Sequence, residues 1–423
     1  MGRRAVWSGS VVPVIVMVLL AGCAPGSSIG GSGAEQLADY TTGSSLSDDG
    51  RYAAIHDPSL GVFRIDRVTH EIDPVSVDPA GNLIGTDFFS SRVSISGDGR
   101  FVTFWSEAVH VATDTNERAD VYRRDLEAGT TQLVTVRPDG SASASLNCVY
   151  ACLSAPWTSD DGRYVVFAST SAELVAGDTN GKPDVFRRDM VTGVTELVSI
   201  NATGSLGDGV SFRPSVSDDG RVVAFESHAS NLVPGGAGAD VLVKDMSTGA
   251  LQRLSDPLGV TPFGSSPSVD GDGSHVALVE SSVHPFASQF YNGLAEVQVT
   301  RRGVNDGSVV LVSKNALGQP GDASSYEPSI SDNGERVVFN TYSANLIPGD
   351  LNNVVDAYVA NVASGAVGRV SSNVIGLAPS HGSDGQQISG DGSLVVFTSG
   401  SWDLNLEPLV LAGATYVTTV VAG

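Results

Sequence analysis

The fold is decided by the stretch SDDGRYVVF at residues 159–167, because close variants of it recur along the chain. Each variant joins a tight turn that ends in glycine to a run typical of a β-strand, in most repeats rich in valine and phenylalanine. The residue pair that ends the turn supplies the positive φ value that a tight hairpin needs. Seven such turns occur, at residues 47–50, 96–99, 159–162, 217–220, 270–273, 331–334 and 389–392.

The spacing of these turns indicates a repeated unit of four short strands. Gly50 and Gly392 are six units apart, which makes one unit about 57 residues long. The run after a turn, such as residues 164–167, is apolar on both faces of the pleat, so neighbouring sheets must cover both faces. A third strand, a second tight turn and a fourth strand of alternating polarity follow, as in residues 184–199. The sequence therefore predicts an all-β chain of packed sheets.

These units resemble the repeats of TolB-like and WD-repeat-like β-propellers. The shared features are the Ser-x-Asp-Gly-Arg turn, the strand of aliphatic residues that ends in Phe, and the strand that reads Asp-aliphatic-aromatic. The resemblance covers residues 46–423 and implies a seven-bladed β-propeller of four-stranded blades. It is specific for the fold and weak for the function.

The two ends of the chain indicate how the ring closes. The seventh unit has three strands, the third at residues 414–420, and then the chain stops without an outer strand. Residues 35–40 read like the missing strand, since they lie upstream of the first turn as the outer strands lie upstream of later turns. We therefore predict a 3+1 closure by an N-terminal strand, which leaves no open sheet edge at the junction.

The first residues are typical of an export signal. Arg3 and Arg4 precede an apolar run at residues 11–20, which is too short to span about 30 Å of hydrocarbon as a helix. Leu-Ala-Gly-Cys at residues 20–23 resembles the lipobox of bacterial lipoproteins. We therefore predict a signal peptide at residues 1–22, lipid attachment at Cys23, and an exported protein anchored to the membrane in the cell envelope. The alternative is an ordinary secretory signal that carries a cysteine.

Removal of the signal peptide would leave a short tether followed by the propeller. Residues 23–34 are rich in Gly, Ser and Pro and predict a flexible tether, and residues 35–423 form the propeller. Two further cysteines, Cys148 and Cys152, lie in a loop-like stretch. In an oxidising compartment they predict a short local disulfide, and the alternatives are a metal pair or two free thiols.

The charge and the strand order restrict the partners. A formal net charge of −23 excludes a basic nucleic-acid-binding protein, and 41% hydrophobic residues exclude a disordered tail. The strand order places all glycine turns on one side of the disc, which we call the turn face, and the longer connections on the other side, the loop face. Binding residues tend to lie on loops held by a rigid scaffold. We therefore expect a protein or glycan partner on the loop face.

One recurring motif on the loop face has oxygen ligands at a regular spacing. The pattern D-x-N-x-x-x-D could contribute ligands to a calcium ion, which takes about six to eight oxygen atoms. The alternative is an Asx turn, in which Asp and Asn bond the local backbone. Calcium is therefore the one cofactor that we predict, at Asp114, Asn116 and Asp120; Asp178, Asn180 and Asp184; and Asp350, Asn352 and Asp356.

Motifs of known enzyme classes are missing from the sequence. It contains no G-x-S-x-G, no H-E-x-x-H and no phosphate-binding Gly loop, and its seven histidines do not recur at one position of the repeat. We therefore predict no catalytic residues and favour an anchored binding or scaffold module. The alternatives are a propeller enzyme that acts on a carbohydrate or lactone, and an accessory subunit of a cell-envelope complex.

Overall fold

The computed structural model describes residues 35–38, 41, 43–85, 93–143, 155–235, 240–255, 266–281, 297–372, 380–401, 404 and 414–420. All regular secondary structure in these ranges is β-strand. The described residues form no helix that is long and apolar enough to cross a membrane.

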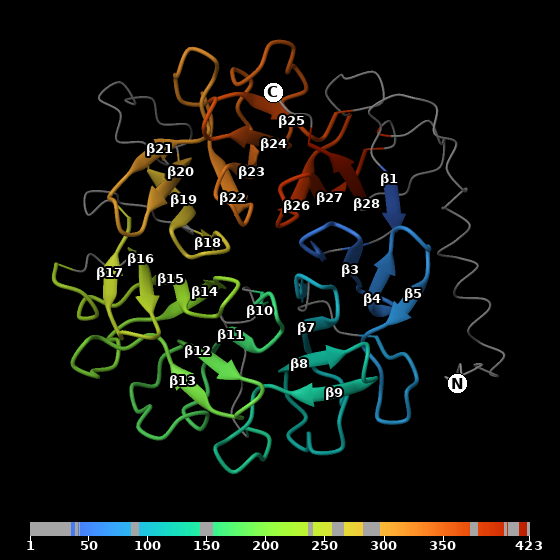
Figure 1. The fold of residues 1–423 in the computed structure, drawn as a ribbon, viewed down its shortest axis with the longest axis vertical. Helices are drawn as coiled ribbons and strands as arrows, with labels where there is room; N and C mark the ends of the chain where they lie inside the picture. The colour runs from blue at the N-terminus through green and yellow to red at the C-terminus, as the bar shows by residue number, and fades with distance from the viewer. Residues whose placement is uncertain are drawn as a thin grey trace.

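The described strands form seven four-stranded antiparallel sheets around one axis, as the sequence predicted (Figure 1). Blade 1 consists of β2 (Gly43–Leu46), β3 (Tyr52–Asp57), β4 (Gly61–Asp66) and β5 (Ile72–Pro74). Blade 2 consists of β6 (Val93–Ile95), β7 (Phe101–Ser106), β8 (Asp120–Asp125) and β9 (Thr130–Leu133). Blade 3 consists of β10 (Trp157–Thr158), β11 (Tyr164–Ser169), β12 (Asp184–Asp189) and β13 (Thr195–Leu197).

The other four blades repeat this order from the axis outward. Blade 4 consists of β14 (Ser211–Val216), β15 (Val222–Ser227), β16 (Asp240–Asp245) and β17 (Leu251–Arg253). Blade 5 consists of β18 (Ser268–Val269), β19 (His275–Ser281), β20 (Val297–Gly303) and β21 (Val309–Leu311). Blade 6 consists of β22 (Ser325–Ile330), β23 (Arg336–Thr341), β24 (Asp356–Asn361) and β25 (Val367–Arg369). Blade 7 consists of β26 (Ser383–Ile388), β27 (Leu394–Ser399), β28 (Ala414–Thr419) and β1 (Glu35–Ala38).

Blade 7 confirms the predicted 3+1 closure, because its outer strand is β1 from the N-terminal end of the propeller. β1 pairs antiparallel with β28, with Glu35 opposite Val417. Leu37 is buried in the core between blades 7 and 1, and Glu35 forms an ion pair with Arg67 of blade 1 at 2.6 Å. The N-terminal strand therefore joins the last blade to the first. Residues 39 and 40 of the predicted strand lie outside the described residues.

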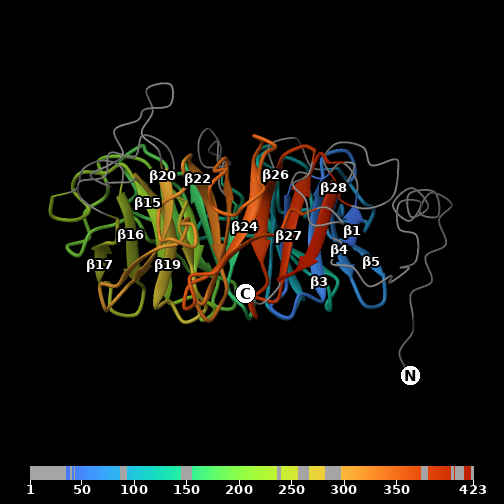
Figure 2. The same cartoon turned by 90° about the horizontal axis from the view of Figure 1, so that it is seen from above.

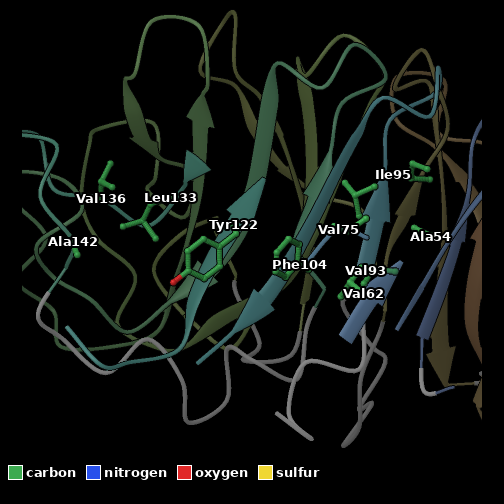
Figure 3. Close-up of a cluster of buried hydrophobic side chains, with 11 residues drawn as sticks. Ala54, Val62, Val75, Val93, Ile95, Phe104, Tyr122, Leu133, Val136 and Ala142 are labelled. Atoms are coloured by element: carbon green, nitrogen blue, oxygen red, sulfur yellow. The ribbon is translucent and has the colours of Figure 1, made fainter. Parts of the chain in front are cut away.

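The hydrophobic core lies between the blades, where the face of one sheet packs on the next (Figure 3). Between blades 1 and 2, for example, Val62 and Val75 join Phe104 and Tyr122 in one cluster. The Phe that ends the aliphatic run in five of the repeats is fully buried, and in four blades it stacks on an aromatic residue of the neighbouring third strand. These ring pairs are Phe104–Tyr122, Phe167–Phe186, Phe339–Tyr358 and Phe397–Tyr416.

On the turn face the seven glycine turns bond to one another in a closed ring. In each turn but the seventh, the N–H of the second residue donates to the carbonyl oxygen of the matching residue in the next blade, as from Asp160 to Asp218 at 3.1 Å. In the seventh turn the third residue, Asp391, donates to Asp48 at 3.0 Å and closes the ring. Every blade is therefore fixed to both neighbours at the axis. The ring runs through Asp48, Gly97, Asp160, Asp218, Gly271, Asp332 and Gly390.

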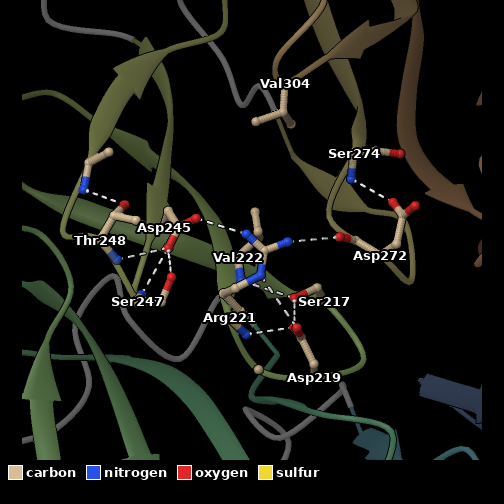
Figure 4. Close-up of polar contacts among 12 residues, drawn as sticks. Ser217, Asp219, Arg221, Val222, Asp245, Ser247, Thr248, Asp272, Ser274 and Val304 are labelled. Carbon is tan, nitrogen blue, oxygen red and sulfur yellow. Dashed lines mark hydrogen bonds and ion pairs between the residues drawn. The ribbon is translucent and has the colours of Figure 1, made fainter.

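Arginine side chains tie the turns together farther from the axis. Arg187 donates from Nη1 to the carbonyl oxygen of Gly220 in the next blade at 2.5 Å and lies over the ring of Tyr164. Arg221 of blade 4 bonds Asp245 at 2.8 Å and the carbonyl oxygen of Asp272 in blade 5 at 3.3 Å (Figure 4). These contacts lie on the turn face, one of the two faces of the disc that Figure 2 shows edge-on.

The closure makes the N-terminal strand a stability element. A chain that begins at Thr41 loses β1 and exposes the edge of β28, so we expect it to unfold at a lower temperature and to aggregate more than a chain that begins at Glu35. Loss of the buried Leu37 side chain alone should lower the free energy of unfolding by about 2 kcal/mol. Thermal unfolding followed by circular dichroism checks this. Equal melting temperatures of the two chains would refute a stabilising role for β1.

Candidate functional site

The predicted calcium loops lead into the third strands of blades 2, 3 and 6. In each loop the Asn amide donates to the last Asp of the motif, which is the first residue of the strand. A Thr or Ser hydroxyl from the start of the next connection donates to the other oxygen of the same Asp. The amide bonds are Asn116–Asp120 at 2.7 Å, Asn180–Asp184 at 2.8 Å and Asn352–Asp356 at 2.9 Å, and the hydroxyl donors are Thr135, Ser199 and Ser371.

Burial has a uniform effect on these last carboxyl groups. It raises the pKa of Asp120, Asp184 and Asp356 to about 6 in each blade. The hydrogen bonds act in the opposite direction, because they stabilise the charged form.

The first Asp of the motif differs among the three blades. In blades 2 and 6 it accepts a hydrogen bond from a tyrosine hydroxyl eight residues later, from Tyr122 to Asp114 and from Tyr358 to Asp350. In blade 3 the residue eight positions after Asp178 is Phe186, which has no hydroxyl. Asp178 Oδ1 is buried and has no hydrogen-bond partner within the described part of the chain, and burial raises the pKa of this carboxyl.

These contacts account for the motif without a metal ion. The Asn side-chain oxygen accepts the backbone N–H two residues later, from Arg118 to Asn116 and from Lys182 to Asn180, both at 2.8 Å, as an Asx turn does. No group of three or more His, Cys, Asp or Glu side chains among the described residues could hold a metal ion. Calcium binding by these loops stays a prediction.

The three cysteines lie outside the described residues, so lipid attachment at Cys23 and the pairing of Cys148 with Cys152 stay predictions. The described histidines of the strands and loops have separate surroundings. His110 packs against Tyr122 and bonds Val77 O, His228 contacts Glu226, and His275 contacts Asp270. They do not form a common site.

A first cluster that the sequence analysis missed lies inside the ring on the turn face. The second residue of the turn is Asp in four blades and Gly in three. A Cβ atom at Gly97 would collide with the carboxylates of both Asp48 and Asp160, so the side chains on either side converge across this glycine. Gly271 lies in the same way between Asp218 and Asp332, and Gly390 between Asp332 and Asp48, whereas Asp160 and Asp218 are direct neighbours. We call Asp48, Asp160, Asp218 and Asp332 the turn-face aspartates.

Burial and crowding raise the pKa values of three of these carboxyl groups. Burial, a hydrogen bond with Asp160 and the neighbouring negative charges raise the pKa of Asp48 to about 8. Burial and the charges of Asp332 and Asp160 raise the pKa of Asp218 to about 7, and the pKa of Asp332 is raised to about 6. The folded protein therefore holds protons here that the unfolded chain releases at lower pH.

A second cluster that the sequence analysis missed lies at the opposite ends of the inner strands, on the loop face. The register of β14, β22 and β26 shifts at a β-bulge in each of these strands. The bulge residues Arg213, Glu327 and Gly385 have φ values of 50°, 50° and 62°, and Ser266 occupies the matching place in blade 5 with φ of 35°. A side chain in the left-handed region before proline is strained, and such strain concentrates at functional positions.

In blade 4 the bulge gathers charged and aromatic side chains. Glu226 is only 3% exposed and faces Arg213 Nη1 through Oε2 and His228 Nε2 through Oε1, both at 3.3 Å. The rings of Phe212 and His228 pack edge to face at 5.4 Å.

Blade 6 places a matching set at the same positions. Tyr326, Glu327, Asn340 and Tyr342 correspond to Phe212, Arg213, Glu226 and His228, and Gln386 of blade 7 donates to the Glu327 carbonyl oxygen at 2.5 Å. The signal for both sets is in the sequence, as SFRPS at 211–215 and SYEPS at 325–329. We call these nine residues the bulge site.

Comparisons with known proteins find relatives by structure and not by sequence. No known protein family matches the chain, and no curated protein matches it. An oligogalacturonate lyase from Vibrio parahaemolyticus matches with a TM-score of 0.52 and 13% identity, over 92% of this chain and 91% of the lyase. The Cps50 (Swd1) β-propeller domain of Myceliophteria thermophila matches with a TM-score of 0.50 and 10% identity, over 92% and 100% of the two chains.

The chain is a seven-bladed β-propeller. TolB from Acinetobacter baumannii, whose repeats the sequence resembles, matches with a TM-score of 0.41 and 15% identity, over 78% of this chain and 64% of TolB. At such identities the likeness concerns the fold alone. The function of the propeller must therefore be argued from its own residues.

The unpaired Oδ1 atom of Asp178 gives a prediction with a control inside the same chain. Phe186→Tyr adds the hydroxyl that Tyr122 and Tyr358 have in their blades, so it should stabilise the propeller by about 1 kcal/mol by pairing a buried acceptor. Tyr358→Phe removes that hydroxyl in blade 6 and should destabilise the fold by a similar amount. Denaturant unfolding measures both. A destabilising Phe186→Tyr would show that blade 3 has no room for the hydroxyl.

The turn-face aspartates predict a pH-dependent stability. The folded pKa values of Asp48, Asp218 and Asp332, about 6 to 8, exceed the usual value of 3.8, so the stability that protonation provides is complete at low pH and is lost as the pH rises through about 8. The melting temperature should therefore fall between pH 5 and pH 8, and Asp218→Asn should flatten this fall.

Asp139→Asn is the control for this prediction. It removes one carboxylate from an exposed turn, and hydrogen bonds from Ser141 lower the pKa of this carboxyl group. If both variants flatten the pH dependence equally, the effect comes from the net charge and not from the cluster.

Proposed function

We propose that this propeller is a lipid-anchored binding module of the cell envelope that holds a protein partner at its bulge site. The observation that carries the proposal is the left-handed conformation of Arg213 and Glu327, each before a proline. Such a conformation costs about 1–3 kcal/mol per residue. A cost that recurs at one place in the repeat supports a role for these side chains in binding.

The chemistry of the bulge site supports a binding role. It combines charged side chains with Phe212, Tyr326 and Tyr342, and Tyr342 is 54% exposed. Aromatic residues and arginine are enriched at the centres of protein interfaces. The inner strands hold these side chains on a rigid scaffold, so little order has to be gained on binding.

The N-terminal segment supports the envelope location. Acylation at Cys23 would attach the chain to a membrane, and the flexible tether at 23–34 would hold the propeller at a distance from the membrane surface. A single buried acyl chain gives only weak, reversible binding, so stable anchoring needs more than one chain.

Site-specific photocrosslinking tests the proposal in the native anchored protein. A photoreactive amino acid in place of Tyr342 on the loop face should yield an adduct with a partner, whereas one in place of Val191, which is 76% exposed on the turn face, should not. Arg213→Ala should weaken the adduct at position 342 by removing a charged contact. Adducts of equal yield at both positions, or none at position 342, would exclude the bulge site as the interface.

The anchor is tested in the same cells with Cys23→Ala. This variant should lose fatty-acid labelling and accumulate as precursor, and its propeller should leave the membrane fraction. A variant that is labelled and matured normally would show that the export signal is of another type.

A further inference from the structure

At the junction of blades 6 and 7 the bulge site contains two buried amide side chains beside one carboxylate. Asn340 is 0% exposed on β23, and Gln386 is 4% exposed on the bulge of β26. Both side chains contact Glu327 on the bulge of β22, Asn340 at Oε2 at 3.4 Å and Gln386 at the backbone oxygen at 2.5 Å.

Glu327 determines the orientation of both amides. The atoms that it presents to them are oxygen acceptors, so each amide must turn its NH2 group toward Glu327 and its carbonyl oxygen away. Rotating either amide by 180° would place two acceptors against each other.

The two carbonyl oxygens are left unpaired by this arrangement. Asn340 Oδ1 and Gln386 Oε1 are buried and have no hydrogen-bond partner within the described residues. A buried acceptor without a donor costs about 1–3 kcal/mol. A ligand that brings donors to this place would recover that cost, whereas a ligand that brings acceptors would not.

We propose that this junction binds an ammonium or guanidinium group, an inference that rests on the proposed binding function. The donors of such a group match the two unpaired carbonyl oxygens, and its positive charge matches the Glu327 carboxylate. The ring of Tyr326, the residue before Glu327, lies with its centroid 6.0 Å from that of Tyr342, and aromatic faces attract cations. The guanidinium group of an arginine has five N–H donors and no acceptor.

The source of the cation is a basic side chain of the protein partner. The net charge of −23 attracts basic surfaces and accelerates their association. A free polyamine carries the same ammonium chemistry, and the experiment separates the two sources.

The experiment measures binding of n-butylguanidinium and of n-butylurea to the folded mature protein by calorimetry and by the shift in melting temperature. The two probes have nearly the same shape, and only the first carries a charge and a full set of donors. We expect the guanidinium probe to bind at least about tenfold more tightly than the urea, since charge-assisted hydrogen bonds are roughly twice as strong as neutral ones. A capped Gly-Arg-Gly peptide should bind at least as well as spermidine.

Glu327→Gln removes the charge and should weaken guanidinium binding about tenfold. Glu335→Gln, which removes the same charge from an exposed position next to the glycine turn of blade 6, should leave it unchanged. If Glu327→Gln melts at a much lower temperature, Tyr342→Ala gives a second test, because this exposed ring can be removed without opening the core and its loss should also weaken binding.

Equal binding of guanidinium and urea, or unchanged guanidinium binding in Glu327→Gln and Tyr342→Ala, would overturn the proposal. Stabilisation by calcium alone, lost in Glu327→Gln, would assign the junction to a metal ion, and tighter binding of spermidine than of the peptide would assign it to a polyamine. If guanidinium fails to bind while crosslinking at position 342 still gives a partner, the ligand class is wrong and the binding function stands.

Discussion

The backbone hydrogen bonds between the seven glycine turns are the constraint on which the rest of the propeller depends. Each bond joins one inner hairpin to the next at about 3 Å, and the bond from Asp391 to Asp48 joins the last to the first. Each turn ends in a glycine with a positive φ value, as Gly162 does, and this conformation allows the tight reversal of the hairpin. The repeated turn therefore determines both the local chain reversal and the spacing of the blades.

The hydrogen-bonded ring restricts which side chains can occupy the second position of each glycine turn. Three of the seven positions are glycine, and a side chain at Gly97 or Gly390 would collide with the carboxylates on either side of it, while Asp160 and Asp218 are direct neighbours. Four carboxyl groups still meet there, and the raised pKa values of Asp48, Asp218 and Asp332 are the electrostatic cost of the geometry that holds the blades together. The turn face thus serves the assembly of the ring.

The loop-face ends of the same strands are free from this constraint, and there the repeats diverge. Bulges in β14, β22 and β26 bring Arg213, Glu327 and Gln386 to positions where a regular strand would carry another residue. Toward the turn face the inner strands are fixed to one another. The hydroxyl oxygens of Ser215, Ser268 and Ser329 each accept a backbone N–H of the next inner strand. A rigid base with a variable rim is the arrangement that suits a binding surface.

The local pattern of the sequence determined the all-β class, the four-stranded unit, the number of blades and the closure by residues 35–38. These features depend on turn residues and on strand periodicity, which are properties of neighbouring residues in the chain. The contacts of the D-x-N-x-x-x-D loops were predictable only in part. The Asx turn is local, but the unpaired oxygen of Asp178 depends on whether Tyr or Phe lies beside it after folding.

The tertiary structure alone decided which side chains meet across blades. Asp48 and Asp332 are far apart in the chain and become neighbours only when the ring closes around Gly390. Asn340, Gln386 and Glu327 belong to three strands, and their contact depends on two bulges that shift the register. Such contacts depend on the rotation between blades and on the position of each bulge. A shift of one residue at a bulge would turn a side chain to the opposite face of its sheet.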